Sequence, residues 1–499
     1  MNDLKSIALA FSKEEQLQFI SFLERKNKRT DIKNIQLFKL LQNEYLSSKD
    51  IGIKLYGNQK KGAYYALRKR LFQSIIEFSA NSSLEDENSL QMDVIKYILA
   101  ARNYLQQKQY KVAYKILNKA ENISLEHHLF PMLNEIYHTQ IQFAHAYPEI
   151  DLDAIIKKFN SNKGKHVLED QLNIVYAKIK YQLTHSNHSD FKTVLERTLK
   201  AHNLNSIDKL SFKSLYQLVS IASVSAFTTK NYLNIESFLI NTYTSILAYK
   251  DKEKQPFYHI QILYHIANTL FRNKKFKASK NYLEYMHKLM LQHKRKYYNT
   301  FKLKYHLLLS LNYNYSNKQA EAISLLEPIL KKKHVDIESV LDIRLSLVMF
   351  YFQQNELQKA HKILSKFYHS DTWYSKKMGM EWVIKKHLIE LLLHIELGNI
   401  DLAESKLLSF KRRYFNYLKS INQHRAITYL ELVEIYYKNP ENVTSESYKS
   451  LVEHAFDWIA PRQEDIFIMS FYAWLKSKMN KKPLYYTTME LIKQAQREK

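Results

Sequence analysis

Apolar and small residues follow a helical spacing between Tyr97 and Ala120, in the segment YILAARNYLQQKQYKVAYKILNKA. Ala101 and Tyr104 share one face of a first helix, and Ala113 and Ala120 share one face of a second. Small residues at such positions let two antiparallel helices approach closely, while the aromatic side chains fill the space toward the next pair. The pattern therefore predicts a packed helical hairpin.

The same hairpin pattern recurs along most of the chain. If Ala113 anchors a second helix, equivalent anchors follow at Ser279, Ala322, Ala360 and Ala403, with weaker ones at Ala154, Val194, Ile235 and Ser447. Successive anchors lie about 42 residues apart, which is the signature of a repeat architecture. We therefore expect an all-α fold in which each hairpin packs against its neighbours.

The spacing of small and aromatic residues in these units resembles the tetratricopeptide (TPR) repeat, whose unit is about 34 residues long. The longer period here predicts about two additional helical turns per pair. The resemblance covers residues 90–460 and implies a right-handed α-solenoid of TPR-like hairpins. Residues 1–85 do not follow the period and predict an N-terminal helical domain. Residues 461–499 predict a capping pair of helices, 464–479 and 484–496.

The TPR resemblance also implies a concave groove lined by the first helix of each repeat. The groove positions that we expect to bind a partner are Gln261, Tyr264, Asn268 and Arg272 in the unit anchored at Ser279, and Lys304, Asn314 and Tyr315 in the next unit. The Lys and Asn pattern with which TPR proteins clamp a terminal carboxylate is only fragmentary, at Asn268 and Lys304. An extended or helical peptide is the better match.

A second resemblance lies in residues 48–78, which are similar to a helix-turn-helix. Ser47 is placed to cap a helix over 48–55, Gly57 lies in a turn, and a long helix follows over 59–78. The turn is about one residue longer, and the second helix longer, than is usual for the motif. The candidate phosphate contacts are Lys60, Lys61, Arg68 and Lys69. The alternative is a helical cap whose basic residues are simply exposed.

Composition argues against several classes of active site. Six Gly and seven Pro in 499 residues favour an almost purely helical chain, and the glycines form no GxGxxG motif. The absence of Cys excludes disulfides, thiolate nucleophiles and cysteine-ligated metals. His185, His188 and Asp190 are the densest metal-like spacing, but no third anchored ligand follows. We therefore expect no enzymatic activity, no cofactor and no metal.

The charge is strongly positive, with 75 Lys plus Arg against 49 Asp plus Glu and a net charge of +26. Residues 250–333 carry 18 of these cations and five acids, with tyrosines interleaved. Basic residues that alternate with aromatic ones can bind single-stranded nucleic acid. The candidate contacts there are Lys274, Lys275, Lys294, Arg295 and Lys296. An ordinary solvated lysine surface remains the competing interpretation, because Lys far outnumbers Arg along the chain.

These observations favour a non-catalytic protein-interaction scaffold that binds an acidic peptide or protein. The alternative is a nucleic-acid-binding regulator that joins an N-terminal helix-turn-helix to a TPR-like sensor array, as the two resemblances together imply. No apolar stretch is long enough to span a membrane, and residues 1–16 lack the features of a signal peptide. We therefore expect a cytoplasmic protein.

Overall fold

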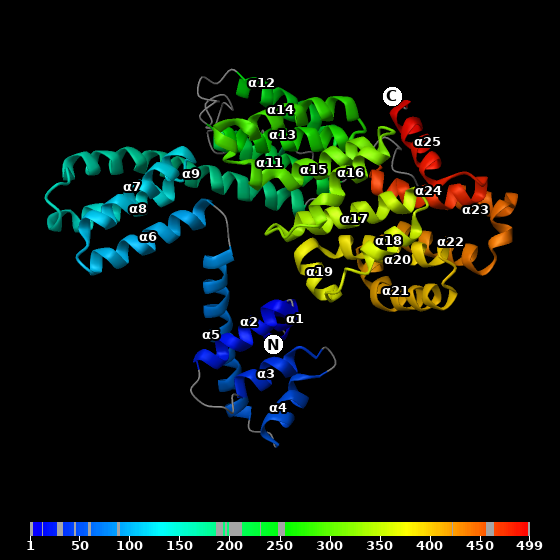
Figure 1. The fold of residues 1–499 in the computed structure, drawn as a ribbon, viewed down its shortest axis with the longest axis horizontal. Coiled ribbons are helices and arrows are strands. Elements are labelled where there is room, and N and C mark those ends of the chain that lie inside the picture. The colour runs from blue at the N-terminus through cyan, green and yellow to red at the C-terminus, as the bar shows by residue number, and fades with distance from the viewer. Residues whose placement is uncertain are drawn as a thin grey trace. The chain divides into compact units, whose positions relative to one another are not determined.

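The computed structural model describes residues 3–11, 13–26, 33–43, 46–57, 61–86, 90–185, 193–194, 197–198, 212–229, 231–247, 255–421, 423–455 and 464–497. Every regular element in these ranges is a helix, and no strand occurs among them (Figure 1). The predicted all-α class is therefore confirmed for the described part of the chain.

The chain forms two compact units. Unit 1 contains residues 1–88 and 357–417, and unit 2 contains residues 89–356 and 418–499. The predicted N-terminal domain, residues 1–85, falls in unit 1, and residues 461–499 fall in unit 2. Residues 90–460 are divided between the two units.

The N-terminal part of unit 1 consists of α1 (Asp3–Ala10), α2 (Lys13–Lys26), α3 (Lys33–Leu41), α4 (Ser48–Tyr56) and α5 (Lys61–Asp86). Their apolar faces meet around Phe19, Phe38 and Leu71, which are fully buried. Phe19 and Phe38 contact each other edge to face at 4.7 Å between ring centroids. Helix α5 continues to Asp86, so it reaches the end of the predicted N-terminal domain.

The second part of unit 1 contains α18 (Leu357–Leu364), α19 (Asp371–Met378), α20 (Met380–Glu396) and most of α21 (Ile400–Ser420). Helix α19 packs against α1, and the Lys376 ammonium donates a hydrogen bond to the carbonyl oxygen of Ser6. Ala360 and Ala403 are buried, as the repeat pattern predicts. Residues more than 350 positions apart in sequence therefore share one unit.

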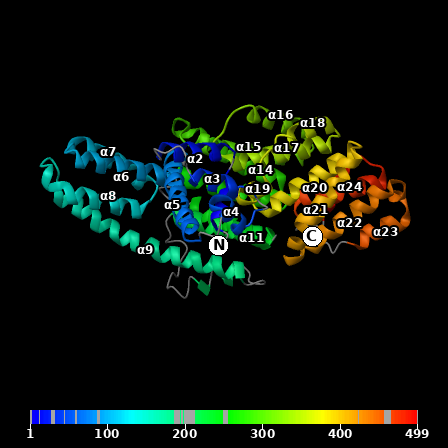
Figure 2. The same cartoon turned by 90° about the horizontal axis from the view of Figure 1, so that it is seen from below.

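Unit 2 begins with α6 (Leu90–Gln106), α7 (Tyr110–Glu126), α8 (Phe130–Phe143), a 3-10 turn and α9 (Leu152–His185). Helices α6, α7 and α8 pack against one another and α8 packs against α9, as Figure 2 shows. The close contact between α6 and α7 buries Ala113 completely, as predicted. The weak anchor Ala154 is exposed on α9, a continuous helix of 34 residues, so it does not serve as a packing position.

The middle of unit 2 contains α11 (Phe212–Thr229), α12 (Leu233–Leu247), α13 (Pro256–Arg272), α14 (Phe276–Arg295), α15 (Tyr298–Asn314), α16 (Gln319–Leu330) and α17 (Ile337–Gln353). Each helix from α11 to α17 packs against the next one, and α13, α15 and α17 also pack in sequence. The three begin at residues 256, 298 and 337, so their spacing of 42 and 39 residues matches the sequence period. Ser279 and Ala322 are fully buried.

The last part of unit 2 contains α22 (His424–Lys438), a 3-10 turn, α23 (Glu446–His454), α24 (Ile466–Asn480) and α25 (Leu484–Arg497). The weak anchor Ser447 is exposed on α23, so it does not serve as a packing position. Helix α24 is buried on nearly every side, with ten of its 15 residues in the interior. Trp474, the largest of them, is 1% exposed.

Candidate functional site

Several residues predicted to line the groove contact the chain's own C-terminal segment. The Arg272 guanidinium, at the end of α13, forms an ion pair with Asp465, which caps the N-terminus of α24. Asp465 also accepts a hydrogen bond from the backbone N–H of Phe467 at 3.0 Å. Burial alone would lower the pKa of Arg272, but the charge of Asp465 raises it above its usual value. The Arg272 side chain is therefore paired within the chain, with Asp465.

Two further groove residues are also covered. The Asn314 side chain is fully buried and donates a hydrogen bond to Gln353 Oε1 at 3.1 Å, and Gln353 in turn donates to Ser470 Oγ of α24 at 3.2 Å. The Tyr485 hydroxyl of α25 donates to the Asn314 carbonyl at 2.5 Å. Tyr315 is 3% exposed, and burial raises its pKa to about 12.

The remaining groove residues stay more accessible. Gln261 is half-buried and accepts a hydrogen bond from the Tyr216 hydroxyl at 2.8 Å. Asn268 and Tyr264 are also half-buried, and Lys304 is exposed. The structure therefore does not bring the seven predicted residues together on one open surface.

Three of the five candidate nucleic-acid contacts in the basic segment have partners inside unit 2. Lys274 is 1% exposed and its ammonium donates to the Glu464 carbonyl at 2.8 Å, so it cannot contact a nucleic acid as predicted. The Lys275 ammonium pairs with Glu236 at 2.5 Å, and that of Lys296 pairs with Glu126 at 2.8 Å. The prediction missed these contacts because each acid lies far away in sequence. Lys294 and Arg295 are exposed at the end of α14.

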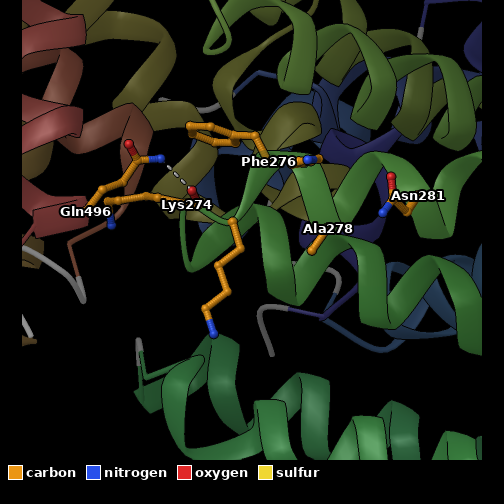
Figure 3. Close-up of a pocket in the computed structure, with 7 residues that line it drawn as sticks. Lys274, Phe276, Ala278, Asn281 and Gln496 are labelled. Carbon is orange, nitrogen blue, oxygen red and sulfur yellow. Dashed lines mark hydrogen bonds between the residues drawn. The ribbon is translucent and has the colours of Figure 1, made fainter.

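A surface pocket lies beside Lys274 and Lys275, at the start of α14 (Figure 3). It is lined by Lys274, Lys275, Phe276, Lys277, Ala278, Asn281 and Gln496. The Gln496 amide of α25 donates to the Lys274 carbonyl at 2.7 Å and forms one wall of the pocket. Lys275, Lys277 and Asn281 are exposed, and the first turn of α14 carries no acidic residue. Lys275 is paired with Glu236 and the Gln496 amide with the Lys274 carbonyl, so the pocket offers the Lys277 cation and the Asn281 amide directly to an anionic group.

In unit 1, α3, α4 and α5 contact one another pairwise, and α4 and α5 occupy the segment for which the helix-turn-helix resemblance is predicted. Ser47 and Asp50 form a reciprocal capping box at the start of α4. Gly57 ends α4 with a positive φ of 72°, which favours glycine. A Cβ atom on Gly52 would lie 3.8 Å from the Tyr64 ring, so α4 and α5 are in close contact there.

The basic residues of this arrangement differ in exposure. Lys69 is exposed, whereas Arg68 is half-buried with its guanidinium 5.7 Å from the centre of the Tyr64 ring. Lys61 begins α5, but its side chain lies outside the described residues, as does all of Lys60. Between residues 33 and 78 the chain has nine Lys or Arg against three acids. This three-helix part is therefore basic.

A charged network in unit 1 was not anticipated from the sequence. His387 of α20 lies between Asp371 of α19, at 2.8 Å, and Glu390, at 3.1 Å. The Arg413 guanidinium and the Tyr414 hydroxyl of α21 also donate to Asp371, at 2.8 and 2.7 Å. No local motif marks this network, because three helices contribute to it.

The network holds its two carboxylates in the ionised form. Burial alone would raise the pKa of Glu390, but the His387 hydrogen bond and the charges of Lys386 and Lys406 lower it to about 2. The pKa of Asp371 is lowered well below its usual value in the same way. The network therefore ties α19, α20 and α21 together by ion pairs.

No cluster of three or more potential metal ligands occurs among the described residues. His188 and Asp190 lie outside them, as does the side chain of His185, so the metal-like spacing there stays a sequence observation. In the described ranges, no helix combines the length and apolar character that crossing a membrane requires. Compared with models of known protein families and with curated proteins, the chain shows no match.

Proposed function

We propose that this protein is a non-catalytic interaction scaffold that binds an acidic peptide or protein segment. The observation that carries the proposal is the pocket at the start of α14, where Lys275 and Lys277 are exposed beside Asn281 and Gln496. Cations grouped around an open concavity attract carboxylates and speed their association. The amides add hydrogen-bond donors that fix the orientation of the bound group.

The chemistry of neighbouring contacts supports the same partner class. Arg272 binds Asp465, Arg425 binds Glu464 at 2.8 Å, and Lys296 binds Glu126. Carboxylates are thus the groups that this part of unit 2 already recognises within the chain. A partner with acidic side chains next to an apolar one would add a contact to Ala278, a pocket residue that is half-buried.

We also propose a TPR-like solenoid as the architecture of the repeated hairpins. The spacing of α13, α15 and α17 supports this proposal, as do the buried small residues Ala113, Ser279 and Ala322. Arg272 and Asn314 of the predicted concave surface have partners within the chain. We therefore propose the pocket beside α25 as the partner site instead.

The test uses a short fluorescein-labelled peptide rich in Glu with one aromatic residue, titrated with the full chain. The double variant Lys275→Gln/Lys277→Gln should weaken binding by at least about tenfold, because it removes both exposed cations of the pocket. Lys331→Gln/Lys332→Gln is the matched control, since both lysines are exposed in the same basic segment and the charge change is equal. Equal affinities for the two double variants would contradict the pocket as the site.

A second candidate function is nucleic-acid binding through α4 and α5. It is favoured by the close contact of Gly52 with Tyr64, by the turn at Gly57 and by the exposed Lys69. In such an arrangement the second helix contacts duplex DNA. Lys69→Gln should then reduce affinity for duplex DNA and lower the salt dependence by about one phosphate contact. An unchanged salt slope would argue against this function.

A further inference from the structure

Helix α5 presents an apolar stripe on its exposed face. Tyr65 is 53% exposed, Phe72 42% and Ile76 45%, although each belongs to a helix whose other face is buried in unit 1. Together with Lys69, these residues follow one another at steps of four, three and four. That spacing is the seam of a two-helix coiled coil, in which side chains of one helix insert between those of another.

The charges of α5 are separated along its length. Its first ten residues contain four cations and no acid, while the remaining 16 contain Glu77, Glu85 and Asp86 and no cation. This order opposes the helix dipole, which favours acids at the N-terminus and cations at the C-terminus. The stability of the isolated helix therefore does not explain this order of charges. An antiparallel neighbour with the same sequence would match both the charges and the dipoles.

We propose that α5 is a homodimer interface, on which a second copy of this chain packs its own α5 in antiparallel orientation. A two-fold axis between Gln73 and Ser74 places Phe72 within one residue of Ile76 of the second copy along the helix axis. The same register places Arg70 beside Glu77 of the second copy, twice by symmetry. Arg70 and Gln73 are exposed, and Glu77 is half-buried. One register thus pairs the two apolar stripes and brings Arg70 and Glu77, each one residue after a stripe position, to the same side of the pair.

Glu77 already has a partner in its own chain, because its carboxylate accepts a hydrogen bond from Lys26. The Lys26 and Glu77 side chains remain 42% and 41% exposed. A carboxylate has about four lone-pair sites, so it can accept a second donor from the other copy. The proposed contact therefore extends an existing ion pair into a small network and does not break it.

The size of the stripe indicates a reversible dimer. Helix α5 has 26 residues and is about 39 Å long. Aromatic side chains carry about 150–250 Å² each, so the exposed parts of Tyr65 and Phe72 contribute roughly 100 Å² apiece. The two aromatic residues of both copies together contribute roughly 400 Å², so the interface remains below the standard size of stable interfaces, whose lower limit is about 1,200 Å² in total. We expect a dissociation constant in the micromolar range.

The first experiment measures the mass of the full chain by analytical ultracentrifugation over a concentration series. Wild type should be dimeric near 100 μM, about 100 times a micromolar dissociation constant. Arg70→Glu and Glu77→Lys should each weaken the dimer at least tenfold, because each places like charges together twice. An equimolar mixture of the two variants should dimerise again, since every contact then joins opposite charges.

Folding and site specificity are controlled separately. Thermal melting followed by circular dichroism checks that each variant remains folded, in particular Glu77→Lys, which also loses the Lys26 contact. Leu17→Glu is the matched control, because Leu17 is 68% exposed on α2 of the same helical unit and lies outside the stripe. Phe72→Glu/Ile76→Glu should abolish dimers while Leu17→Glu leaves them intact. Equal masses for these two variants would overturn the proposal.

The second experiment tests the orientation with a thiol-reactive bismaleimide cross-linker, since the natural chain has no cysteine to interfere. Gln73→Cys lies next to the two-fold axis and should cross-link to its second copy. Tyr65→Cys should not, because the two copies of residue 65 lie about 25 Å apart along the antiparallel pair. Cross-linking through Tyr65→Cys would indicate a parallel pair and overturn the arrangement.

The dimer and the nucleic-acid candidate exclude each other on this surface, because the pair covers Lys69. A wild-type chain that stays monomeric at 100 μM, with Arg70→Glu affecting only binding to duplex DNA, would overturn the dimer in favour of nucleic acid. A monomeric chain without any such binding would also overturn it, and would assign the stripe to a contact within one chain.

Discussion

Helices α24 and α5 both carry apolar residues on more than one side, but their surroundings differ. Helix α24 lies inside unit 2 with ten of 15 residues buried, and residues from α13, α17 and α22 bind it. Helix α5 buries one face in unit 1 and leaves Tyr65, Phe72 and Ile76 exposed. An apolar face in the sequence therefore indicates that a packing partner is needed. Only the three-dimensional structure shows whether the same chain provides that partner.

The largest expected effect comes from removing one large apolar side chain from each helix, which tests whether α24 is buried and α5 is exposed. Trp474→Ala should reduce the free energy of unfolding of unit 2 by about 3–5 kcal/mol, because Trp474 is 1% exposed and its loss leaves a cavity. Phe72→Ala should change stability by less than about 0.5 kcal/mol in the monomer. Urea denaturation at low protein concentration measures both. Equal losses would mean that α5 is buried in the monomer.

A smaller effect is expected from the ion pair that attaches α24 to α13. Arg272→Met should cost about 2–3 kcal/mol, because it leaves the Asp465 carboxylate without its charged donor. The double variant Arg272→Met/Asp465→Asn should recover part of that loss, and the thermodynamic cycle gives the coupling. If the two single losses simply add, the pair does not hold α24 in place.

Acidification should destabilise the surroundings of α24, and this effect is the next in size. Burial, together with the charge of Lys304, lowers the pKa of His265 in α13 from 6.5 to about 4. Between these values the unfolded chain binds a proton that the folded chain does not, so stability falls as pH drops from about 6.5 to 4. Hydrogen exchange at pH 7 and 5, corrected for intrinsic rates, should show faster opening of α24 at pH 5. His265→Gln should reduce this difference, and an unchanged difference would exclude His265.

The smallest effect concerns salt. The proposed contacts of Arg70 with Glu77 are exposed, so added salt screens them and should weaken self-association several-fold. Burial of Trp474 is apolar, and the free energy of unfolding of unit 2 should change little over the same range. Sedimentation and urea denaturation at low and high salt compare the two. A dimer that tightens with salt would indicate an interface without these ion pairs.

The sequence predicts the local structure of these regions well. The capping residue Ser47, the turn at Gly57 and the buried small residues Ala113, Ala322, Ala360 and Ala403 are all where the pattern places them. The predicted helix over 464–479 is also present with nearly the same bounds. Such features depend on residues a few positions apart, whose spacing along a helix is fixed by geometry.

The candidate site was harder to predict, because its contacts join distant residues. The partner that buries Lys274 is the carbonyl of Glu464, which lies 190 positions away. Asp371 is bound by Arg413, 42 positions later on another helix. Neither pair has a local signature, and lysine is ordinarily a surface residue. The pocket beside Gln496 was missed for the same reason, since α25 closes it from the far end of the sequence.

The position of α24 has a consequence for synthesis. Arg272 leaves the ribosome 193 residues before its partner Asp465. At about 5–20 residues per second, α13 and α15 wait roughly 10 to 40 s for the helix that covers them. During that interval the surface that later receives α24 is open, so a nascent chain displays an apolar binding site that the finished protein lacks. Truncated chains that stop before α24 should therefore engage chaperones that the complete chain does not need.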